Sequence, residues 1–370
     1  MTTRDDRRTA PAAPGRAFDA AAVESWARAI LARAGLTAED AGLVAGSLLF
    51  ADRRGVPTHG VARIPLYVRR LSAGGISPGA RPVIVCDAGA LCVMDGHAAA
   101  GAVTGVQAAR LAAARARRHG VGVTVVRGGN DFGAAGYYAA LLAAGGCVGL
   151  AACNSDAVMC APGGTSPVLG TNPLAFAVPG TSLLLDMATS AAAHGKIAHA
   201  AAEGRAIPAG WGLDASGQDT TDPRQVLDGG CVLPAAGPKG FGLALLIDVM
   251  AVLAGARPSP FIPGAESEPG LPQNLGMLFL AIYPGHCLEP PAFQAGVADL
   301  IGAVHATGAA GGRRVMVPGE PEAAYGASLG DRIRLPGHLL AGLVRVGREM
   351  GVPFPDVNGP EPAGTPEEVS

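Results

Sequence analysis

A short stretch near the N-terminus brings together groups that can carry out proton chemistry. Residues 53–63 read RRGVPTHGVAR, so the hydroxyl of Thr58, the imidazole of His59 and the small residue Gly60 adjoin, and Arg63 follows one turn later. Histidine titrates nearest to neutral pH, which suits it to donate or accept protons. Arginine can bind a carboxylate through two parallel hydrogen bonds. If the protein is an enzyme, we expect its proton transfer here.

Helices are expected on both sides of this stretch. Asp19 can cap a helix that stops at Gly35, and Thr37 with Asp40 resembles a capping box for a second helix. Pro65 suits the first turn of a third helix, which ends at paired glycines. The candidate residues therefore lie between the second and third helices of a small helical unit.

After this unit, short apolar runs alternate with helical patterns, which indicates a sheet covered by helices. The expected elements are a hairpin of VIVCD and ALCVMDG, a helix over 102–119, strand VGVTVV, a helix over 134–145, strand GCVGLAAC, strand SLLLDM at 182–187, a helix to about Ala202, an apolar helix near 240–255, strand LGMLFLAIYP, a helix over 292–306, and a C-terminal helix in LPGHLLAGLVRVGREMG. The run from Gly242 to Gly255 is too short to span a membrane, and we expect it to be a buried helix.

The expected domains follow these changes of pattern. Residues 1–16 mix both charge signs with prolines and are expected to be a disordered leader, not a secretory signal. Residues 17–80 form a helical domain on which about 325–352 pack, residues 81–324 form an α/β domain for cofactor and substrate, and residues 353–370 form a flexible tail.

Composition argues against several classes of function. A formal net charge of -2 offers no basic face for nucleic acid, and no run is long enough for a membrane span. The seven cysteines are odd in number and form no CxxC pair. This usage is typical of a reducing cytoplasm, so we expect neither a disulfide framework nor a metal site.

The common nucleotide-binding motifs do not occur in the sequence. Neither GxGxxG nor GxxxxGK[ST] is found. The nearest substitute is GGNDFGAAG at 128–136, where a strand ends and a helix begins, and where free backbone N–H groups can bind an anion. A helix entry capped by Asn130 or Asp131 is the simpler explanation of the same residues on local grounds.

Eight stretches in order together resemble the type 2 malate/L-lactate dehydrogenase family, which includes ureidoglycolate and sulfolactate dehydrogenases and cyclic imino acid reductases. They are ADRRGVPTHGVARIPLYVRRLSAGGI, NDFGAAGYYA, LGTNPLAFAVP, LLLDMATS, GKI, IPAGWGLDASGQDTTDP, GPKGFGLALLIDVM and PQNLGMLFLAI. The resemblance implies an α/β fold of three layers around a mixed sheet, of the L-sulfolactate dehydrogenase type and not Rossmann, with a helical N-terminal domain joined by the C-terminal helix. It also implies NAD or NADP as cofactor, a small carboxylate substrate, and a cytoplasmic homodimer.

The resemblance implies roles for individual residues as well. His59 matches the proton donor of the imine reductases, Thr58 the serine before it, and Asp186 a carboxylate in a charge relay with that pair. Arg63 matches a substrate-binding arginine, and Asn172 is expected near the substrate. The expected cofactor contacts are Asp131, Phe132, Gly133, Ala134, Ala135, Ser155, Met187, Ala188, Lys239 and Gly240.

Three positions depart from the family pattern: Thr58 mildly, as a threonine for serine, and two others that each replace a histidine. Asp131 stands where the family usually has histidine, the acid/base of ureidoglycolate dehydrogenase, and Pro238 also replaces a usual histidine. An ionised aspartate is a poor proton donor to a ketone, but beside a cationic iminium carbon it is attractive. We therefore expect an NAD(P)-dependent dehydrogenase or reductase of a 2-hydroxy acid, 2-oxo acid or cyclic imino acid, with His59 as proton donor or acceptor. The alternative is a catalytically altered homologue with a ligand-binding or non-redox role.

Overall fold

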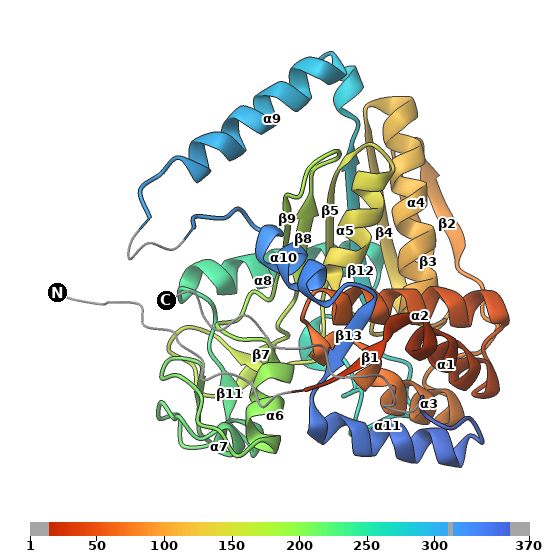
Figure 1. The fold of residues 1–370 in the computed structure, drawn as a ribbon, viewed down its shortest axis with the longest axis vertical. Helices are drawn as coiled ribbons and strands as arrows, with labels where there is room; N and C mark the ends of the chain where they lie inside the picture. Colours follow the sequence, from red (N-terminus) through yellow and green to blue (C-terminus); the bar gives the residue numbers. More distant parts are fainter. Residues whose placement is uncertain (1–14, 310–313, 356–370) are drawn as a thin grey trace.

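A seven-stranded sheet lies at the centre of the molecule (Figure 1). The computed structural model describes residues 15–309 and 314–355, so most of the expected leader and tail lies outside the described residues. From edge to edge the strands are β2 (Val83–Ala88), β3 (Leu91–Asp95), β4 (Val121–Gly129), β12 (Leu275–Ile282), β5 (Val148–Cys153), β8 (Leu174–Ala177) and β9 (Leu184–Met187). β3 and β4 are parallel, and the other neighbours in this sheet are antiparallel. The expected mixed sheet is confirmed.

Helices cover both faces of this sheet. On one face, α4 (Gly101–His119) and α5 (Ala135–Ala144) bury an apolar cluster with β12, in which Tyr138 contacts Phe279. On the other face lies α8 (Pro238–Ala254), and a Cβ added at Gly276 of β12 would lie 2.3 Å from the Cβ of Ala251. Alternate residues of a strand point to opposite faces, so the three-layer architecture follows from this register.

The N-terminal helices are α1 (Ala20–Arg33), α2 (Ala38–Arg53) and α3 (Ile64–Ala73). Both expected caps are confirmed: an Asp19 carboxylate oxygen accepts from the Ala22 N–H at 2.7 Å, and the Thr37 hydroxyl accepts from the Asp40 N–H at 3.2 Å. These bonds satisfy N–H groups that the first turn of a helix leaves free. Helix α3 ends at Gly74, which adopts a positive φ of 90°.

The end of the chain completes this helical unit. Strand β1 (Arg16–Asp19) pairs with β13 (Arg332–Leu335), and α11 (Gly337–Glu349) packs on α3. Beyond α11, the ring of Phe354 packs edge-on against Trp26. Arg16 and Phe354, which belong to the expected leader and tail, therefore have defined places in the fold.

A second, four-stranded sheet was not expected from the sequence. It consists of β10 (Gly212–Leu213), β11 (Cys231–Val232), β6 (Met159–Cys160) and β7 (Pro167–Leu169). Its strands have two or three residues each, too few for a periodic pattern. Two helices, α6 (His194–Ala202) and α7 (Pro223–Leu227), pack together beside it, and short 3-10 turns η3 (Ser259–Phe261) and η4 (Pro284–His286) occur elsewhere.

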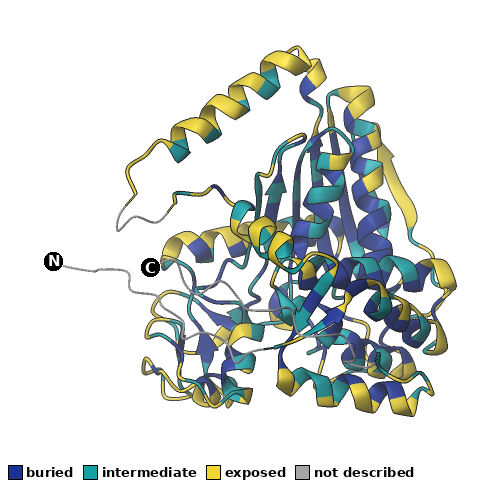
Figure 2. Cartoon of the chain, viewed as in Figure 1, coloured by how far each residue is buried: buried dark blue, intermediate teal, exposed yellow. Residues whose placement is uncertain are grey.

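One expectation about burial is wrong. Helix α8 is not buried all round: its exposed apolar side chains are Leu243, Leu245, Leu246, Val249, Val252 and Leu253. Figure 2 shows exposed colour along α8, along the edge strand β2, and along α9 (Pro290–His305), which extends away from the body. Helix α10 (Glu320–Leu329) leads back to the helical unit. The apolar sequence of α8 indicated a helix buried on all sides, but within the described chain only the side that faces the sheet is buried.

The register of the sheet brings several loops together at one end of its central strands, which is called the sheet edge below. Leu275 pairs with Gly129, Met277 with Cys153, and Leu174 with Met187. The ends of β4, β5 and β9 therefore meet the beginnings of β12 and β8. Most of the candidate cofactor residues lie just beyond these strand ends.

Candidate active site

Two consecutive 3-10 turns hold the THG stretch between α2 and α3. They are η1 (Pro57–His59) and η2 (Val61–Arg63), with Gly60 between them. The carboxylate of Asp52, in the last turn of α2, accepts from the Val61 N–H at 2.9 Å. A Cβ added at Gly60 would lie 1.8 Å from Oδ1 of Asp52. Close packing therefore requires glycine at position 60, and the hydrogen bond from the Val61 N–H to Asp52 holds the turn against the end of α2.

Asp52 was missed by the sequence analysis. Its side chain is 1% exposed, and its Oδ1 has no hydrogen-bond partner among the described residues. Burial raises the pKa of Asp52 to about 8, against the lowering effect of the Val61 N–H. At neutral pH the carboxyl group is therefore largely protonated.

Thr58 and His59 form the polar centre of the turn. The Thr58 hydroxyl lies 3.1 Å from Nδ1 of His59. Burial and the nearby Arg63 guanidinium lower the pKa of His59 to about 4; Asp131 opposes this shift and Lys196 adds to it. The imidazole is therefore neutral at pH 7 and is a base, not an acid, before substrate binds.

Arg63 and Asp131 form an ion pair across the site, with side chains 25% and 17% exposed. Burial alone would raise the pKa of Asp131, but Arg63 and the Gly133 N–H together lower it below its usual value. The carboxylate is therefore ionised. The Arg63 guanidinium also lies over the Tyr67 ring, 5.9 Å from its centroid. Its Nε is buried and has no hydrogen-bond partner among the described residues, so it offers a free donor.

A buried arginine positions this ion pair, and sequence reasoning did not identify it. Arg70 of α3 is fully buried and donates to Oδ1 of Asn130 at 3.0 Å, while the Asn130 amide donates to the carbonyl oxygens of Ala98 and Ala99. Thus Asn130 does not cap α5. The available signal was helical spacing, because Arg70 shares the buried face of α3 with Tyr67.

Asp186 lies on edge strand β9 and is exposed. Its Oδ2 accepts from the Gly136 N–H at 2.8 Å, at the start of α5. In the described chain no hydrogen bond or ion pair joins Asp186 to Thr58 or His59. The structure therefore caps α5 with Asp186 and does not bring it to the histidine.

Asn172 is also committed to the protein itself. Its Oδ1 accepts from the Ser155 N–H at 3.0 Å, and its amide donates to the Ala244 carbonyl and to Asp248 at 2.9 and 2.8 Å. The side chain is completely buried. Asn172 therefore positions the Ser155 turn and keeps no donor for a substrate. Asp248, the acidic residue in the middle of α8, connects the same loops through Asn154 at 3.0 Å.

The other candidate cofactor residues surround the sheet edge. Ala188 follows β9 and precedes Thr189, whose carbonyl accepts from the Ala235 N–H at 3.0 Å, just before α8. Gly240 packs so closely that an added Cβ would lie 2.3 Å from the Thr189 carbonyl oxygen. Met187 and the exposed Lys239 thus belong to two segments that are fastened together.

The stretch from Asp131 to Ala135 divides into two parts. Phe132 is 3% exposed and stacks on Tyr138 at 4.6 Å, so its ring belongs to the core. Gly133 has a φ of +74°, and Ala134, at the N-cap position just before α5, has no side chain that could cap the helix, which Asp186 caps instead. Gly133, Ala134 and Ala135 are buried as well, and the Gly133 N–H donates to Oδ1 of Asp131 at 2.9 Å.

A cavity of about 290 Å³ lies nearby, between α5, the β8–β9 turn and α10. Arg54 is on its wall, but its described lining includes none of Thr58, His59 and Arg63, so it is separate from the proton-transfer residues. Among the described helices, none is both long enough and apolar enough to cross a membrane.

Comparison with known proteins gives a consistent result. Residues 18–344 match the family model described as malate/L-lactate dehydrogenase. The chain is 35% identical to the L-sulfolactate dehydrogenase of Methanocaldococcus jannaschii, over 88% of this chain and 95% of that protein. It is 35% identical to the NAD(+) ureidoglycolate dehydrogenase of Escherichia coli (79% and 84%) and to a Delta(1)-pyrroline-2-carboxylate/Delta(1)-piperideine-2-carboxylate reductase of Pseudomonas putida (71% and 78%).

Solved structures resemble the fold as closely. The sulfolactate dehydrogenase from Methanocaldococcus jannaschii superposes with a TM-score of 0.84 at 34% identity, covering 91% of this chain and 98% of that one. The delta1-piperideine-2-carboxylate reductase from Pseudomonas syringae superposes with a TM-score of 0.81 at 30% identity, covering 90% and 99%. The expected sulfolactate-dehydrogenase-like fold is confirmed.

Proposed function

The chain belongs to the malate/L-lactate dehydrogenase family and is a dehydrogenase or reductase that uses a nicotinamide cofactor, and we propose that it reduces a cyclic imino acid with NADH or NADPH. The oxidation of a small 2-hydroxy acid, or the reverse reduction of a 2-oxo acid, is the second candidate. The observation that carries the proposal is the Arg63–Asp131 ion pair beside a neutral His59.

The sheet edge has the groups that a dinucleotide needs. The start of α8 can bind phosphate, because the positive end of the helix dipole and the charge of Lys239 lie there. We propose that Gly133 to Ala135, Ser155, Met187 to Ala188, and Lys239 to Gly240 hold the cofactor. When bound, the nicotinamide ring supplies or accepts the hydride.

We propose that Arg63 binds the carboxylate of the substrate. Its buried Nε donor has no partner among the described residues, and a guanidinium donates to a carboxylate in a fork geometry. Asp131 already balances part of the Arg63 charge. A second anionic group on the substrate would face Asp131, so this site favours monocarboxylates over the dicarboxylates and sulfonates that some relatives are named for.

His59 fits the imino acid reaction better than the reduction of a ketone. Ketone reduction needs a proton donor, whereas a His59 with a pKa of about 4 is neutral at pH 7. A cyclic iminium already has its proton on nitrogen, and Asp131 attracts its positive charge. In the direction of hydroxy acid oxidation, neutral His59 accepts the hydroxyl proton. Arg63 lowers the pKa of His59. A substrate carboxylate bound to Arg63 offsets that positive charge and therefore raises the pKa of His59.

Asp186 and Asn172 have supporting places in this proposal. Asp186 orients the start of α5 through Gly136, and Asn172 orients Ser155. Thr58 fixes the His59 ring through Nδ1 and thereby leaves Nε2 for proton transfer.

We also propose that the protein is a cytoplasmic homodimer. The apolar side chains on the outer face of α8 include Leu246, Val249 and Leu253, which are 56%, 56% and 64% exposed. A contiguous apolar surface of this kind is typical of a protein interface. All seven cysteines are free, which suits a reducing compartment.

A substrate panel tests the proposed reaction. NADH or NADPH oxidation is followed by absorbance with pyrroline-2-carboxylate, piperideine-2-carboxylate, pyruvate, oxaloacetate, sulfopyruvate and oxalurate. We expect the two cyclic imino acids to have the highest kcat/KM; a preference for oxaloacetate or sulfopyruvate would refute the proposed substrate class. Thermal shift with each cofactor tests the rival non-redox role, because a cofactor that binds the folded state raises its melting temperature. No shift with either would favour that rival.

A further inference from the structure

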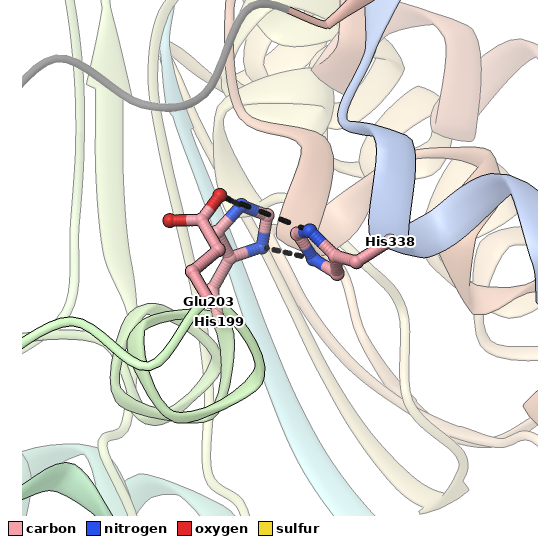
Figure 3. A group of neighbouring side chains, drawn as sticks. All are labelled: His199, Glu203 and His338. Atoms are coloured by element: carbon pink, nitrogen blue, oxygen red, sulfur yellow. Dashed lines mark hydrogen bonds and ion pairs between the residues drawn. The ribbon is translucent and has the colours of Figure 1, made fainter.

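Three metal-ligating side chains meet between α6 and α11, away from the residues assigned above. His199 lies on α6, Glu203 immediately follows that helix, and His338 lies in the first turn of α11 (Figure 3). His199 and Glu203 are four residues apart, so they share one face of α6. His338 approaches that face from a segment 139 positions away from His199.

One ligand atom from each of the three side chains lies within 4.8 Å of the other two. Nε2 of His199 lies 3.4 Å from Oε1 of Glu203, while the other nitrogen of His199, Nδ1, lies 3.2 Å from Nε2 of His338 and joins the two rings. Nδ1 of His338 lies 3.8 Å from the same oxygen. In a tetrahedral zinc site with bonds of about 2.0 to 2.1 Å, neighbouring ligand atoms are about 3.3 Å apart. The two nitrogen–oxygen distances to Oε1 of Glu203, 3.4 and 3.8 Å, are close to that spacing.

The carboxylate oxygen that faces the histidines is buried and lies within ion-pair distance of both rings, but it accepts no hydrogen bond from the described residues. Oε1 of Glu203 has no hydrogen-bond partner among the described residues, and the Glu203 side chain is only 9% exposed. Its other oxygen accepts from Nε of Arg205 at 2.7 Å, which fixes the orientation of the group. A buried acceptor that lacks a hydrogen bond is costly, and a bound cation would remove that cost.

We propose that His199, Glu203 and His338 form a zinc site that joins α6 to α11. Two imidazoles and one carboxylate are a ligand set that suits this ion, and water can complete its coordination. The site would fasten the helical unit to α6, whose first turn packs on the proton-transfer residues: a Cβ added at Gly195 would lie 3.1 Å from Cβ of Thr58. The ion thus holds in place the segment that also carries Lys196.

Cobalt(II) titration of the whole, chelator-treated protein tests the site. We expect one equivalent per chain, with visible absorption bands of a nitrogen- and oxygen-bound ion and without the near-ultraviolet band of a thiolate ligand. Zinc should displace the cobalt and raise the melting temperature. His338→Gln should weaken binding at least tenfold and abolish the melting shift. His305→Gln is the matched control, since His305 also pairs with a glutamate, Glu320, and should bind as the wild type does.

Each other outcome overturns the proposal. It fails if binding is not saturable, if His338→Gln binds cobalt like the wild type, or if a thiolate band shows that the exposed Cys86 or Cys287 holds the ion. His199→Gln repeats the test from the α6 side and decides the matter if His338→Gln does not fold.

Discussion

Arg63 and Asp131 form an ion pair between the turn that precedes α3 and the loop that follows β4. The pair joins the helical unit to the sheet edge, and it sets the charge of the proposed substrate site. The negative charge of Asp131 offsets most of the positive charge of Arg63. The Nε donor of Arg63 has no hydrogen-bond partner among the described residues. The identity of residue 131 should therefore control which anions the site accepts.

Asp131→Asn should shift preference toward substrates with two anionic groups. Removal of the carboxylate leaves the Arg63 charge unbalanced, and a difference of one close charge interaction is worth about tenfold in specificity, or about 1.4 kcal/mol. We expect the ratio of kcat/KM for oxaloacetate to that for pyrroline-2-carboxylate to rise at least by this factor. Asp131→His should move the ratio in the same direction. Equal ratios in all three proteins would remove Asp131 from the account of specificity.

His59→Ala should abolish most hydroxy acid oxidation and leave cofactor binding intact. Neutral His59 accepts the hydroxyl proton in that direction, and because a positioned base contributes about a hundredfold to ten-thousandfold, we expect kcat to fall by that factor. The dissociation constant of the cofactor, measured by fluorescence titration, should change little. His97→Ala, at an exposed position, is the control and should be fully active. Near-normal turnover of His59→Ala would show that another group transfers the proton.

Asp52 should make stability depend on pH in an unusual direction. Its pKa is raised from 3.8 to about 8, so the folded state retains a proton that the unfolded state has lost. Its contribution to stability is complete below about pH 4 and is lost as pH rises toward 8. Asp52→Asn should therefore reduce the fall in melting temperature between pH 6 and 8 relative to the wild type. Parallel melting curves for the two proteins would contradict the raised pKa.

Gly60→Ala should be strongly destabilising, because the new methyl group overlaps the buried Asp52 carboxyl. Overpacking of this kind costs about 1 to 3 kcal/mol, and it should also displace His59 and lower kcat. Denaturant unfolding measures the first effect. Gly296→Ala, in α9 where an added Cβ meets nothing within 4 Å, is the matched substitution and should not reduce stability. Equal stability of the two variants would mean that the turn adapts freely.

The exposed face of α8 should be required for dimer formation. Leu246→Asp combined with Val249→Asp places two charges on that face and should convert the protein to a monomer in light scattering coupled to size-exclusion chromatography. Val85→Asp is the control, because Val85 lies on a different exposed apolar surface, the edge strand β2. This variant should remain a dimer. A wild-type protein that is already monomeric would refute the proposed assembly.

The features that the sequence predicted correctly depend on neighbouring residues. Asp19 and Thr37 cap helices that begin beside them, and the alternating pattern of Leu91 to Asp95 belongs to its own hairpin. These features need no information about distant parts of the chain. The family resemblance supplied the overall architecture, because eight ordered motifs define it together.

Features that depend on distant contacts were missed. The sequence shows neither that Asp131 pairs with Arg63 nor that Arg70 reaches Asn130, 60 positions away. The placement of Asp186 against Gly136, rather than beside His59, depends on how β9 lies against α5. The same holds for His199 and His338. Their helices come together only in the folded molecule, and neither histidine has a neighbouring ligand motif in the usual zinc pattern.

The contact between the two ends of the chain has a consequence for biosynthesis. Nε1 of Trp26 donates to the carbonyl oxygen of Val352 at 2.9 Å, across 326 positions of the sequence. Strand β1 likewise pairs with β13, which lies near the other end of the described residues. On the ribosome, α1 and β1 therefore cannot complete their packing until β13 and Val352 have been made. Contacts so distant in sequence slow folding, because a long loop must close before they form. Truncation at the C-terminal end should accordingly yield a chain that remains bound to chaperones rather than a shorter active enzyme.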